Sequence, residues 1–419
     1  GVCNHGYARM SERPFHAPLT QFSIVEDELV IGGVRLRQLA AQVGETPFFA
    51  YDREAMAGRV RELREALPEG ISIHYAMKAN PMPAVVDHMA VLVDGLDVAS
   101  LGEMRVALDS GTAPAEISFA GPGKGDNELH AAVAAGITLN LESAGELERA
   151  LRAGDALGVA PRVAVRVNPD FELKSSGMKM SGGPKPFGID AEAVPTVLQR
   201  IGESGAYFRG LHIYSGSQNL RPDSLIEAQD ATFALAYRLA EDTPAALEML
   251  NIGGGFGVPY FPGEQRLRLD AVSENLERRV SECRRRLGDA EIVIELGRYL
   301  VAEAGIYVCQ VVDKKISRGQ TYLVTNGGLH HHLAASGNFG QVIRKNYPVV
   351  TAHRVNQAPR EIVSVVGPLC TPLDVLADRM ELGVAEIGDL IAVLQSGAYG
   401  FSASPHLFLG HPLPRQVLI

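Results

Sequence analysis

The sequence predicts an α/β fold, a (β/α)8 barrel of the TIM type plus a C-terminal all-β domain, and three observations support it. Up to residue 298, short β-branched runs alternate with longer amphipathic stretches. The strand-like runs there number eight, whereas an open doubly wound sheet usually has fewer units. After residue 300, strand-like runs follow one another without long helices. We expect an N-terminal segment (1–45) that joins the β-domain, a barrel (46–298) and a β-domain (299–419).

Each barrel strand is predicted from a short apolar or alternating run. The eight runs are Ile71–Lys78, Gly95–Ser100, Glu116–Ala120, Ile137–Ser143, Arg162–Pro169, Gly210–Ser215, Leu247–Gly255 and Glu291–Gly297. Helices are predicted at 54–67, 102–110, 144–153, 223–241 and 266–287. The β-domain is predicted from runs at 305–312, 321–325, 361–366 and 389–394, with N-terminal pieces at 22–25 and 48–51.

Composition excludes several classes of function. The formal net charge of −10 argues against a nucleic-acid partner and against binding to anionic membrane surfaces. No apolar run approaches the ~20 residues that span a bilayer, and the N-terminus has no apolar signal-peptide core. The four cysteines are widely spaced, so neither a zinc knuckle nor a disulfide framework is indicated. These features predict a cytoplasmic protein.

Lys78 closes the first predicted strand and is followed by Ala-Asn-Pro. In a (β/α)8 barrel the active site lies at the C-terminal ends of the strands. A lysine there can simply extend its amine to solvent at the barrel rim. Alternatively, a desolvated lysine loses its proton and becomes a nucleophile able to form a Schiff base.

Other strand ends also carry polar residues or glycines. Asp97 ends the second strand and Arg166 the fifth, and both are candidates for the lining of the site. The sixth strand runs into Tyr214-Ser-Gly-Ser217, and the seventh ends in Gly253-Gly254-Gly255. A glycine run lets backbone N–H groups approach a phosphate, although alone it is also compatible with a tight turn. Two such loops on adjacent strands favour a phosphate site.

Six motifs occur in order between residues 74 and 401: HYAMKANP, HIYSGSQ, NIGGGFG, ELGR, GPLCTPLD and SGAYGF. Together they resemble the fold-type III pyridoxal-phosphate (PLP) decarboxylases, the group of diaminopimelate, ornithine and arginine decarboxylases. The resemblance covers nearly the whole chain. It implies a barrel plus a β-domain, PLP as cofactor, and a homodimer whose active sites are shared between the two chains.

The resemblance also implies roles for individual residues. Lys78 resembles the lysine that forms the PLP Schiff base, Glu295 the carboxylate that pairs with the pyridine nitrogen, and Cys370 the proton donor from the partner chain. The family's ring-stacking histidine is replaced by Tyr214, and His212 lies two residues earlier. The implied phosphate and cofactor contacts further include Ser217, Gly253, Gly254, Gly255, Arg298 and Tyr399. The implied substrate contacts are Arg298, Thr371, Asp374 and Tyr399.

Glu295 favours decarboxylation over racemisation. A carboxylate at the ring nitrogen keeps the pyridine protonated, the form that best stabilises the carbanion left by CO₂, whereas alanine racemases resemble a solution with an arginine there. The competing interpretation of Glu295 is a salt bridge with Arg298. Cys370 would protonate the carbanion as a general acid, although a free cysteine is more commonly a small buried apolar residue.

The substrate is less constrained. Thr371 and Pro372 follow the cysteine where diaminopimelate and ornithine decarboxylases usually have an acidic residue, so a distal ammonium group loses its partner. The chain resembles a branch that includes carrier-protein-linked glutamate decarboxylases and exosortase-associated decarboxylases. The Lys-rich loop 174–190, with Lys174, Lys179 and Lys185, could meet a phosphopantetheine arm or an acidic carrier, or could be a solvated loop.

Three alternatives stay open at this point: a free diaminopimelate or diamine decarboxylase, an amino-acid racemase, and a non-catalytic PLP-binding protein. No metal site is expected. Consecutive histidines on a strand point to opposite faces, so His330-His331-His332 is interpreted as a loop near the substrate or the phosphate rather than as a metal site.

Overall fold

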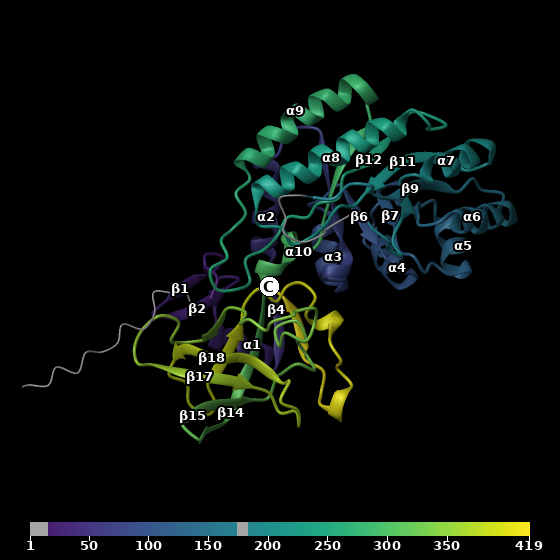
Figure 1. Ribbon diagram of the computed structural model, residues 1–419. Helices are drawn as coiled ribbons and strands as arrows, with labels where there is room; N and C mark the ends of the chain where they lie inside the picture. The colour runs from purple at the N-terminus through teal and green to yellow at the C-terminus, as the bar shows by residue number, and fades with distance from the viewer. Residues whose placement is uncertain (1–15, 174–182) are drawn as a thin grey trace, which may run out of the picture.

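The computed structural model describes residues 16–173 and 183–419. The chain forms two bodies, a barrel surrounded by helices and a β-domain beneath it (Figure 1). Within the described residues, no helix combines the length and the apolar character needed to cross a membrane.

Eight parallel strands form a closed ring, because β8 pairs with both β7 and β9. The (β/α)8 barrel predicted from the sequence is therefore confirmed. The ring strands are β5 (Ile71–Ala76), β6 (Gly95–Val98), β7 (Ile117–Phe119), β8 (Thr138–Leu141), β9 (Arg162–Asn168), β11 (Tyr207–Ile213), β12 (Met249–Asn251) and β13 (Glu291–Leu296), and β10 (Ile189–Asp190) adds to β9 outside the ring.

Helices surround this ring and bury one apolar face each against it. In α6, for example, Leu147 and Ala150 are buried against the barrel. The helices of the barrel are α2 (Arg53–Ala66), α3 (Pro83–Ala90), α4 (Leu101–Asp109), α5 (Asp126–Ala135), α6 (Ala144–Leu157), α7 (Val194–Glu203), α8 (Pro222–Ala240), α9 (Asp270–Leu287) and α10 (Arg298–Val301).

The inner face of the barrel is unusually polar. Along β5, Ile73 and Tyr75 join the apolar core between strands and helices, while His74 between them contacts Asp97 on β6. This alternation is the period of two that a strand imposes. The predicted first strand is two residues too long: β5 ends at Ala76, and Lys78 lies on a single 3-10 turn, η1 (Met77–Ala79), closed by the Asn80 N–H donating to Met77 O.

The β-domain is a mixed sheet with a second apolar core. Its strands are β14 (Gly305–Ser317), β15 (Gln320–Thr325), β16 (Val349–Thr351), β17 (Arg360–Val366), β18 (Val375–Gly383), β19 (Leu390–Val393), β20 (Arg415–Leu418) and β4 (Phe48–Tyr51). The chain before β4 supplies a small sheet, β1 (Ser23–Val25), β2 (Glu28–Ile31) and β3 (Val34–Arg35), and helix α1 (Leu36–Val43). Hence the N-terminal segment does pack with the β-domain, since Leu29, Ile31, Leu36 and Leu39 belong to its core.

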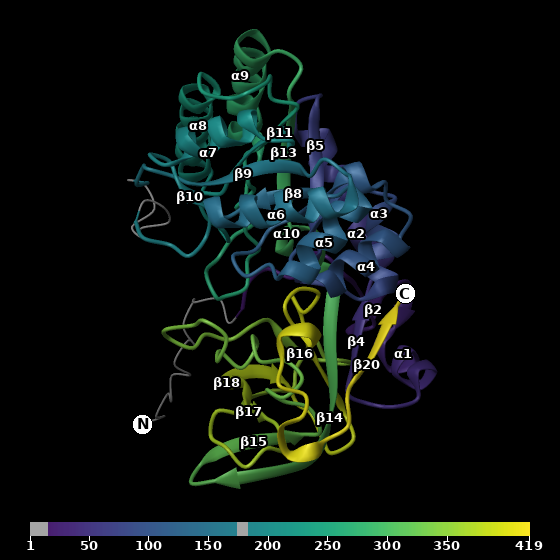
Figure 2. The same ribbon diagram turned by 90° about the vertical axis from the view of Figure 1, so that its right-hand side faces the viewer.

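Strand β4 extends this sheet from the N-terminal side. It pairs antiparallel with β14 and parallel with β20, the last strand of the chain, and so lies between these two strands (Figure 2). The predicted domain limits placed 48–51 in the barrel, and these pairings put it in the β-domain instead. We propose the division at Asp52, whose carboxylate caps α2 by accepting from the N–H groups of Glu54 and Ala55.

Candidate active site

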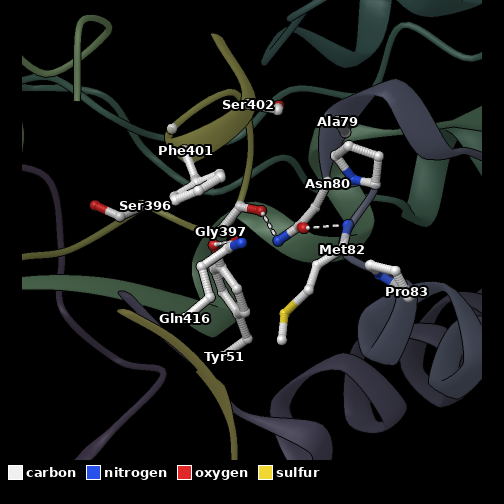
Figure 3. Close-up of a pocket in the computed structure, with 12 residues that line it drawn as sticks. Tyr51, Ala79, Asn80, Met82, Pro83, Ser396, Gly397, Phe401, Ser402 and Gln416 are labelled. Carbon is white, nitrogen blue, oxygen red and sulfur yellow. Dashed lines mark hydrogen bonds between the residues drawn. The ribbon is translucent and has the colours of Figure 1, made fainter. Parts of the chain in front are cut away.

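The loop that carries Lys78 is held between the two domains (Figure 3). The Asn80 side chain donates from Nδ2 to Gly397 O (2.9 Å) and accepts from the Met82 N–H (3.2 Å). The Tyr399 N–H donates to Ala79 O (2.8 Å). The motifs around Lys78 and Tyr399, more than 300 residues apart in the chain, thus meet beside a cavity of about 220 Å³. Lys78 itself is exposed to solvent at the end of the first barrel strand.

Glu295 lies next to Asp97 inside the barrel, and the two carboxyl groups are hydrogen-bonded. Burial alone would raise the pKa of Glu295, but the hydrogen bond from Asp97 and the charges of His212, Lys78 and Arg166 lower it to about 2. Burial and the charge of Glu295 raise the pKa of Asp97 well above its ordinary range. Glu295 is therefore the stronger acid of the two and the one that carries the negative charge.

Two further side chains approach the Glu295 carboxylate. Asn251 donates from Nδ2 to Oε2 (3.2 Å), and His212 Nε2 lies 3.7 Å from the same oxygen. His212 is 1% exposed, and neither of its ring nitrogens has a hydrogen-bond partner among the described residues. Burial lowers the pKa of His212 to about 4, so the ring is neutral at neutral pH.

Arg166 is oriented by an ion pair with the end of the neighbouring strand. Its guanidinium lies 2.9 Å from Glu142, which also accepts from the Gly121 and Gly188 N–H groups. The guanidinium lies over the ring of Tyr214, 5.9 Å from its centroid. Tyr214, in the position of the family's stacking histidine, therefore contacts Arg166, and its ring is 36% exposed toward the mouth of the barrel.

The two glycine-containing loops after β11 and β12 pack backbone against backbone. Asn219 forms a bridge with Phe256: its N–H donates to Gly255 O (2.8 Å), and its carbonyl accepts from the Gly257 N–H (2.8 Å). Gly253 and Gly255 adopt positive φ, +71° and +79°. A Cβ on Gly254 would lie 2.1 Å from Glu295 O, so only glycine fits there. Ser217 is exposed at the rim of the same loops.

Arg298 follows β13, and its guanidinium contacts two tyrosines, Tyr260 and Tyr399. It donates from Nη1 to the Tyr260 hydroxyl (2.8 Å), and its guanidinium lies 4.6 Å from the Tyr399 ring centroid. The salt bridge between Glu295 and Arg298, considered as a competing interpretation, is absent from the ion pairs of the described residues. Glu295 is thus free of a permanent cationic partner from its own strand.

The Cys370 loop lies between β17 and β18 of the β-domain. Cys370 is exposed, which excludes the alternative of a buried apolar cysteine within the single chain. Asp374 is 2% exposed, and its oxygens accept from the N–H groups of Leu329 (2.8 Å) and Leu369 (3.0 Å). In this chain Asp374 therefore organises the loop that presents Cys370. Thr371 is half-buried beside it and lines a cavity of about 460 Å³.

The three consecutive histidines are buried inside the β-domain. His331 is held by Tyr307 (2.8 Å) and Pro412 O (2.8 Å), and His332 Nε2 by the Ser396 hydroxyl (2.9 Å). The hydrogen bonds of His331 and His332 are therefore internal to the domain. Of the loop 174–190, residues 174–182, which include Lys174 and Lys179, lie outside the described residues.

These features together fit pyridoxal phosphate. A glycine-rich loop with two positive-φ residues follows β12, an ionised carboxylate lies inside the barrel, and an exposed lysine follows the first strand. A closed (β/α)8 barrel with this set of groups at its strand ends defines a class, the barrel enzymes that use PLP.

Comparison with known proteins identifies the family within that class. Residues 53–302 match the model of the pyridoxal binding domain of pyridoxal-dependent decarboxylases. The chain is 38% identical over 384 residues to L-glutamyl-[BtrI acyl-carrier protein] decarboxylase of Niallia circulans, with 89% of each chain covered. It is 30% identical to diaminopimelate decarboxylase of Aquifex aeolicus over 94% of its own length and 91% of the relative's.

The fold comparison agrees. Diaminopimelate decarboxylase from M. jannaschii, solved with L-lysine, superimposes with a TM-score of 0.85 at 26% identity, covering 95% of this chain and 92% of that one. The chain belongs to the pyridoxal-dependent decarboxylases. It is an amino-acid decarboxylase, and its cofactor is pyridoxal phosphate.

Several residues at the site were not singled out from the sequence. His74, Asn80 and Asn251 each make a contact that fixes a predicted site residue or its loop. The sequence did contain one indication of His74. In a strand alternate side chains point to opposite faces, so His74 points away from the face that carries Ile73 and Tyr75 and toward the inside of the barrel. For Asn80 and Asn251 the partner could be known only from the folded structure.

Proposed function

We propose that this enzyme decarboxylates an α-amino acid that a carrier protein presents as a thioester, a glutamyl group being the first candidate. The observation that carries the proposal is the 38% identity over 89% of the chain to a decarboxylase named for such a substrate. Neutral residues at the Cys370 loop support it. Thr371 and Pro372 offer no carboxylate to a distal ammonium group, so a free diamino acid would bury an unpaired charge there.

The residues that hold the cofactor in this proposal all lie at the strand ends. Lys78 would hold PLP through its amine, and the Ser217 and Gly253–Gly255 loops would bind its phosphate with backbone N–H groups and a hydroxyl. Glu295 would pair with the ring nitrogen, with Asp97 and Asn251 fixing its carboxylate. Tyr214, Arg166, Arg298 and Tyr399 would supply further contacts to the cofactor.

When bound, PLP supplies the electron sink for the electron pair released as CO₂ leaves. The ionised Glu295 keeps the ring nitrogen protonated and so strengthens that sink. Cys370 would donate the proton to the α-carbon as a general acid. An exposed cysteine on the β-domain suits a role in the site of a second chain, which is part of the proposal together with the homodimer and a cytoplasmic location.

A substrate screen tests the proposal. Purified enzyme with PLP is assayed for CO₂ release from glutamyl and other aminoacyl thioesters of carrier proteins, and from the same amino acids free in solution. We expect release from a carrier-bound substrate and at least tenfold less from free diaminopimelate, ornithine or lysine, one factor of ten being about 1.4 kcal/mol of discrimination. Faster turnover of a free diamino acid would replace the proposed substrate with the alternative.

The same assay separates the other two alternatives. A racemase would exchange the α-hydrogen with solvent deuterium while the carboxylate is retained. A non-catalytic PLP-binding protein would take up the cofactor, seen as visible absorption, and release no CO₂ from any substrate. Glu295→Gln provides the internal test, because loss of turnover with PLP binding kept would support its role in the reaction.

A further inference from the structure

His74 is a buried, titratable side chain that has no role in the proposed decarboxylation. It lies on β5, is 3% exposed, and its Nδ1 is 2.9 Å from Asp97 Oδ1 on β6. Its register partner on β6 is Gly95, and a Cβ at Gly95 would lie 2.6 Å from His74 Nε2. The absence of a side chain at position 95 therefore makes room for the imidazole ring.

The second ring nitrogen faces two carboxylates at the other end of the barrel. His74 Nε2 is buried and has no hydrogen-bond partner among the described residues. A ring nitrogen of His74 and one carboxylate oxygen each of Glu116, at the end of η2 (Pro114–Glu116), and Glu291, at the start of β13, all lie within 4.8 Å of one another. Within residues 16–173 and 183–419 neither glutamate forms an ion pair with a lysine or arginine.

The ring thus links two groups of acids. Toward the active site it contacts Asp97, which lies beside Glu295, and toward the barrel floor it faces Glu116 and Glu291. These four carboxyl groups come from two barrel strands, β6 and β13, and from η2, and His74 is the group placed between them. Asp97 is buried and Glu116 and Glu291 are half-buried, and carboxyl groups gathered in such surroundings favour a positive charge among them.

We propose that His74 is a permanent imidazolium that positions Asp97 against Glu295, and that it thereby sets the charge of the carboxylate facing the cofactor. With the Nδ1–H donated to Oδ1, the other oxygen of Asp97 is left for the neighbouring Glu295 carboxyl group. Burial lowers the pKa of His74, but the carboxyl groups of Asp97, Glu291 and Glu295 around the ring raise it to about 9, which supports the charged form.

His74 is a positioning residue in this proposal. Its effect on catalysis rests on the proposed role of Glu295, whereas its charge does not. The competing occupant of the space between His74, Glu116 and Glu291 is a divalent cation, since an imidazole with two carboxylates is a common ligand set and Asp97 would orient the ring. A metal-bound Nε2 cannot carry a proton. The two alternatives therefore exclude each other and can be separated directly.

The first experiment measures the charge of His74 without the cofactor. The apoenzyme is labelled with ¹⁵N-histidine, and the signal lost in His74→Asn identifies the ring. We expect an imidazolium signal at pH 7 that persists to about pH 9, and an unchanged signal after treatment with EDTA. A neutral tautomer at pH 7, or one stoichiometric metal ion that elemental analysis finds in the purified enzyme and not in Glu116→Gln, would overturn the proposal.

The second experiment measures the effect on the site. His74→Asn keeps a donor near the Nδ1 position but removes the charge, while His74→Phe removes both. We expect the pH at which the absorption of bound PLP changes to shift by about one unit in His74→Phe, with kcat lowered about tenfold and KM within twofold, one pKa unit corresponding to one factor of ten. His74→Asn should lie between this variant and the wild type.

His130→Asn, on the exposed face of α5, is the matched control and should behave as wild type. If His74→Phe binds PLP and shows the wild-type pH profile, the positioning role is wrong even where the imidazolium is observed. If Glu295→Gln also leaves turnover unchanged, the assignment of Glu295 fails, and the charge of His74 is then judged by the first experiment alone.

Discussion

At the scale of single residues, the site depends on buried acids whose charges differ because their surroundings differ. Asp97 and Glu295 are adjacent carboxyl groups, yet the pKa of one is raised and that of the other is lowered. Asp374 is a third buried acid, with a raised pKa because burial outweighs two backbone hydrogen bonds. The charge of such an acid can be tested by replacing the carboxyl group with the amide of the same shape, as in Glu295→Gln and Asp374→Asn.

Asp374→Asn should destabilise the Cys370 loop. Asparagine has one carbonyl oxygen where the carboxylate offers two, so one of the N–H groups of Leu329 and Leu369 loses its acceptor. A buried unsatisfied donor costs about 1–3 kcal/mol, which thermal unfolding of the apoenzyme would detect. The same change at Asp378, an exposed acid on β18, is the control, and equal losses in both variants would contradict the assignment.

The apoenzyme should lose stability above neutral pH through His74. Its folded-state pKa, about 9, is above the ordinary 6.5, so its contribution is fully present below pH 6.5 and is lost as the pH rises through 9. At 1.36 kcal/mol per pKa unit the loss is at most roughly 3 kcal/mol. Urea unfolding at pH 6 and pH 9.5 should show this difference in wild type and not in His74→Asn; identical pH dependence in both proteins would exclude it.

At the scale of elements, strand ends and the loops after them determine the site. The glycine loop after β12 packs directly on the backbone of β13, where Glu295 lies. The loop after β11 is joined to it by the bridge between Asn219 and Phe256. A change in one loop must therefore displace the phosphate contacts and the pyridine-facing acid together.

Gly254→Ala tests this coupling. Its Cβ would lie 2.1 Å from Glu295 O and 2.6 Å from Leu296 Cδ2, so the backbone has to move. We expect a folded protein whose PLP affinity falls at least tenfold, about 1.4 kcal/mol, measured by titration of the visible absorption. Gly205→Ala, where a Cβ would meet nothing within 4 Å, should bind PLP as wild type does. Unchanged affinity in Gly254→Ala would mean that PLP does not use this loop.

At the scale of the whole molecule, the two domains jointly present the residues of the site. Arg59 of α2 and Glu303 of η3 (Ala302–Ala304) form an ion pair of 2.9 Å that is nearly inaccessible to solvent. Asn80 joins the Lys78 loop to Gly397 of the C-terminal part. Lys78 belongs to the barrel and Cys370 to an exposed loop of the β-domain, so a site shared between two chains can be tested by mixing variants.

Lys78→Ala and Cys370→Ala should each be inactive as homodimers and should regain activity when mixed. In a mixed dimer one site has both residues and the other has neither. If half of the dimers are mixed and each has one good site, activity returns to about a quarter of wild type. Measurement of CO₂ release after confirmed subunit exchange checks this. No recovery would exclude the shared site, and an active Cys370→Ala homodimer would exclude the cysteine as proton donor.

The sequence by itself determined the barrel, the β-domain, the family and the strand ends where Lys78, Glu295 and the glycine loop lie. Local periodicity and short motifs carry that information, because each depends on neighbouring residues. Only the tertiary structure decided that Lys78 lies on a 3-10 turn, that Asp374 binds two backbone N–H groups, and that His74 joins Asp97 to the acids of the barrel floor. These are contacts between distant residues in a buried environment, and their geometry and charge exist only after the strands have closed into a ring.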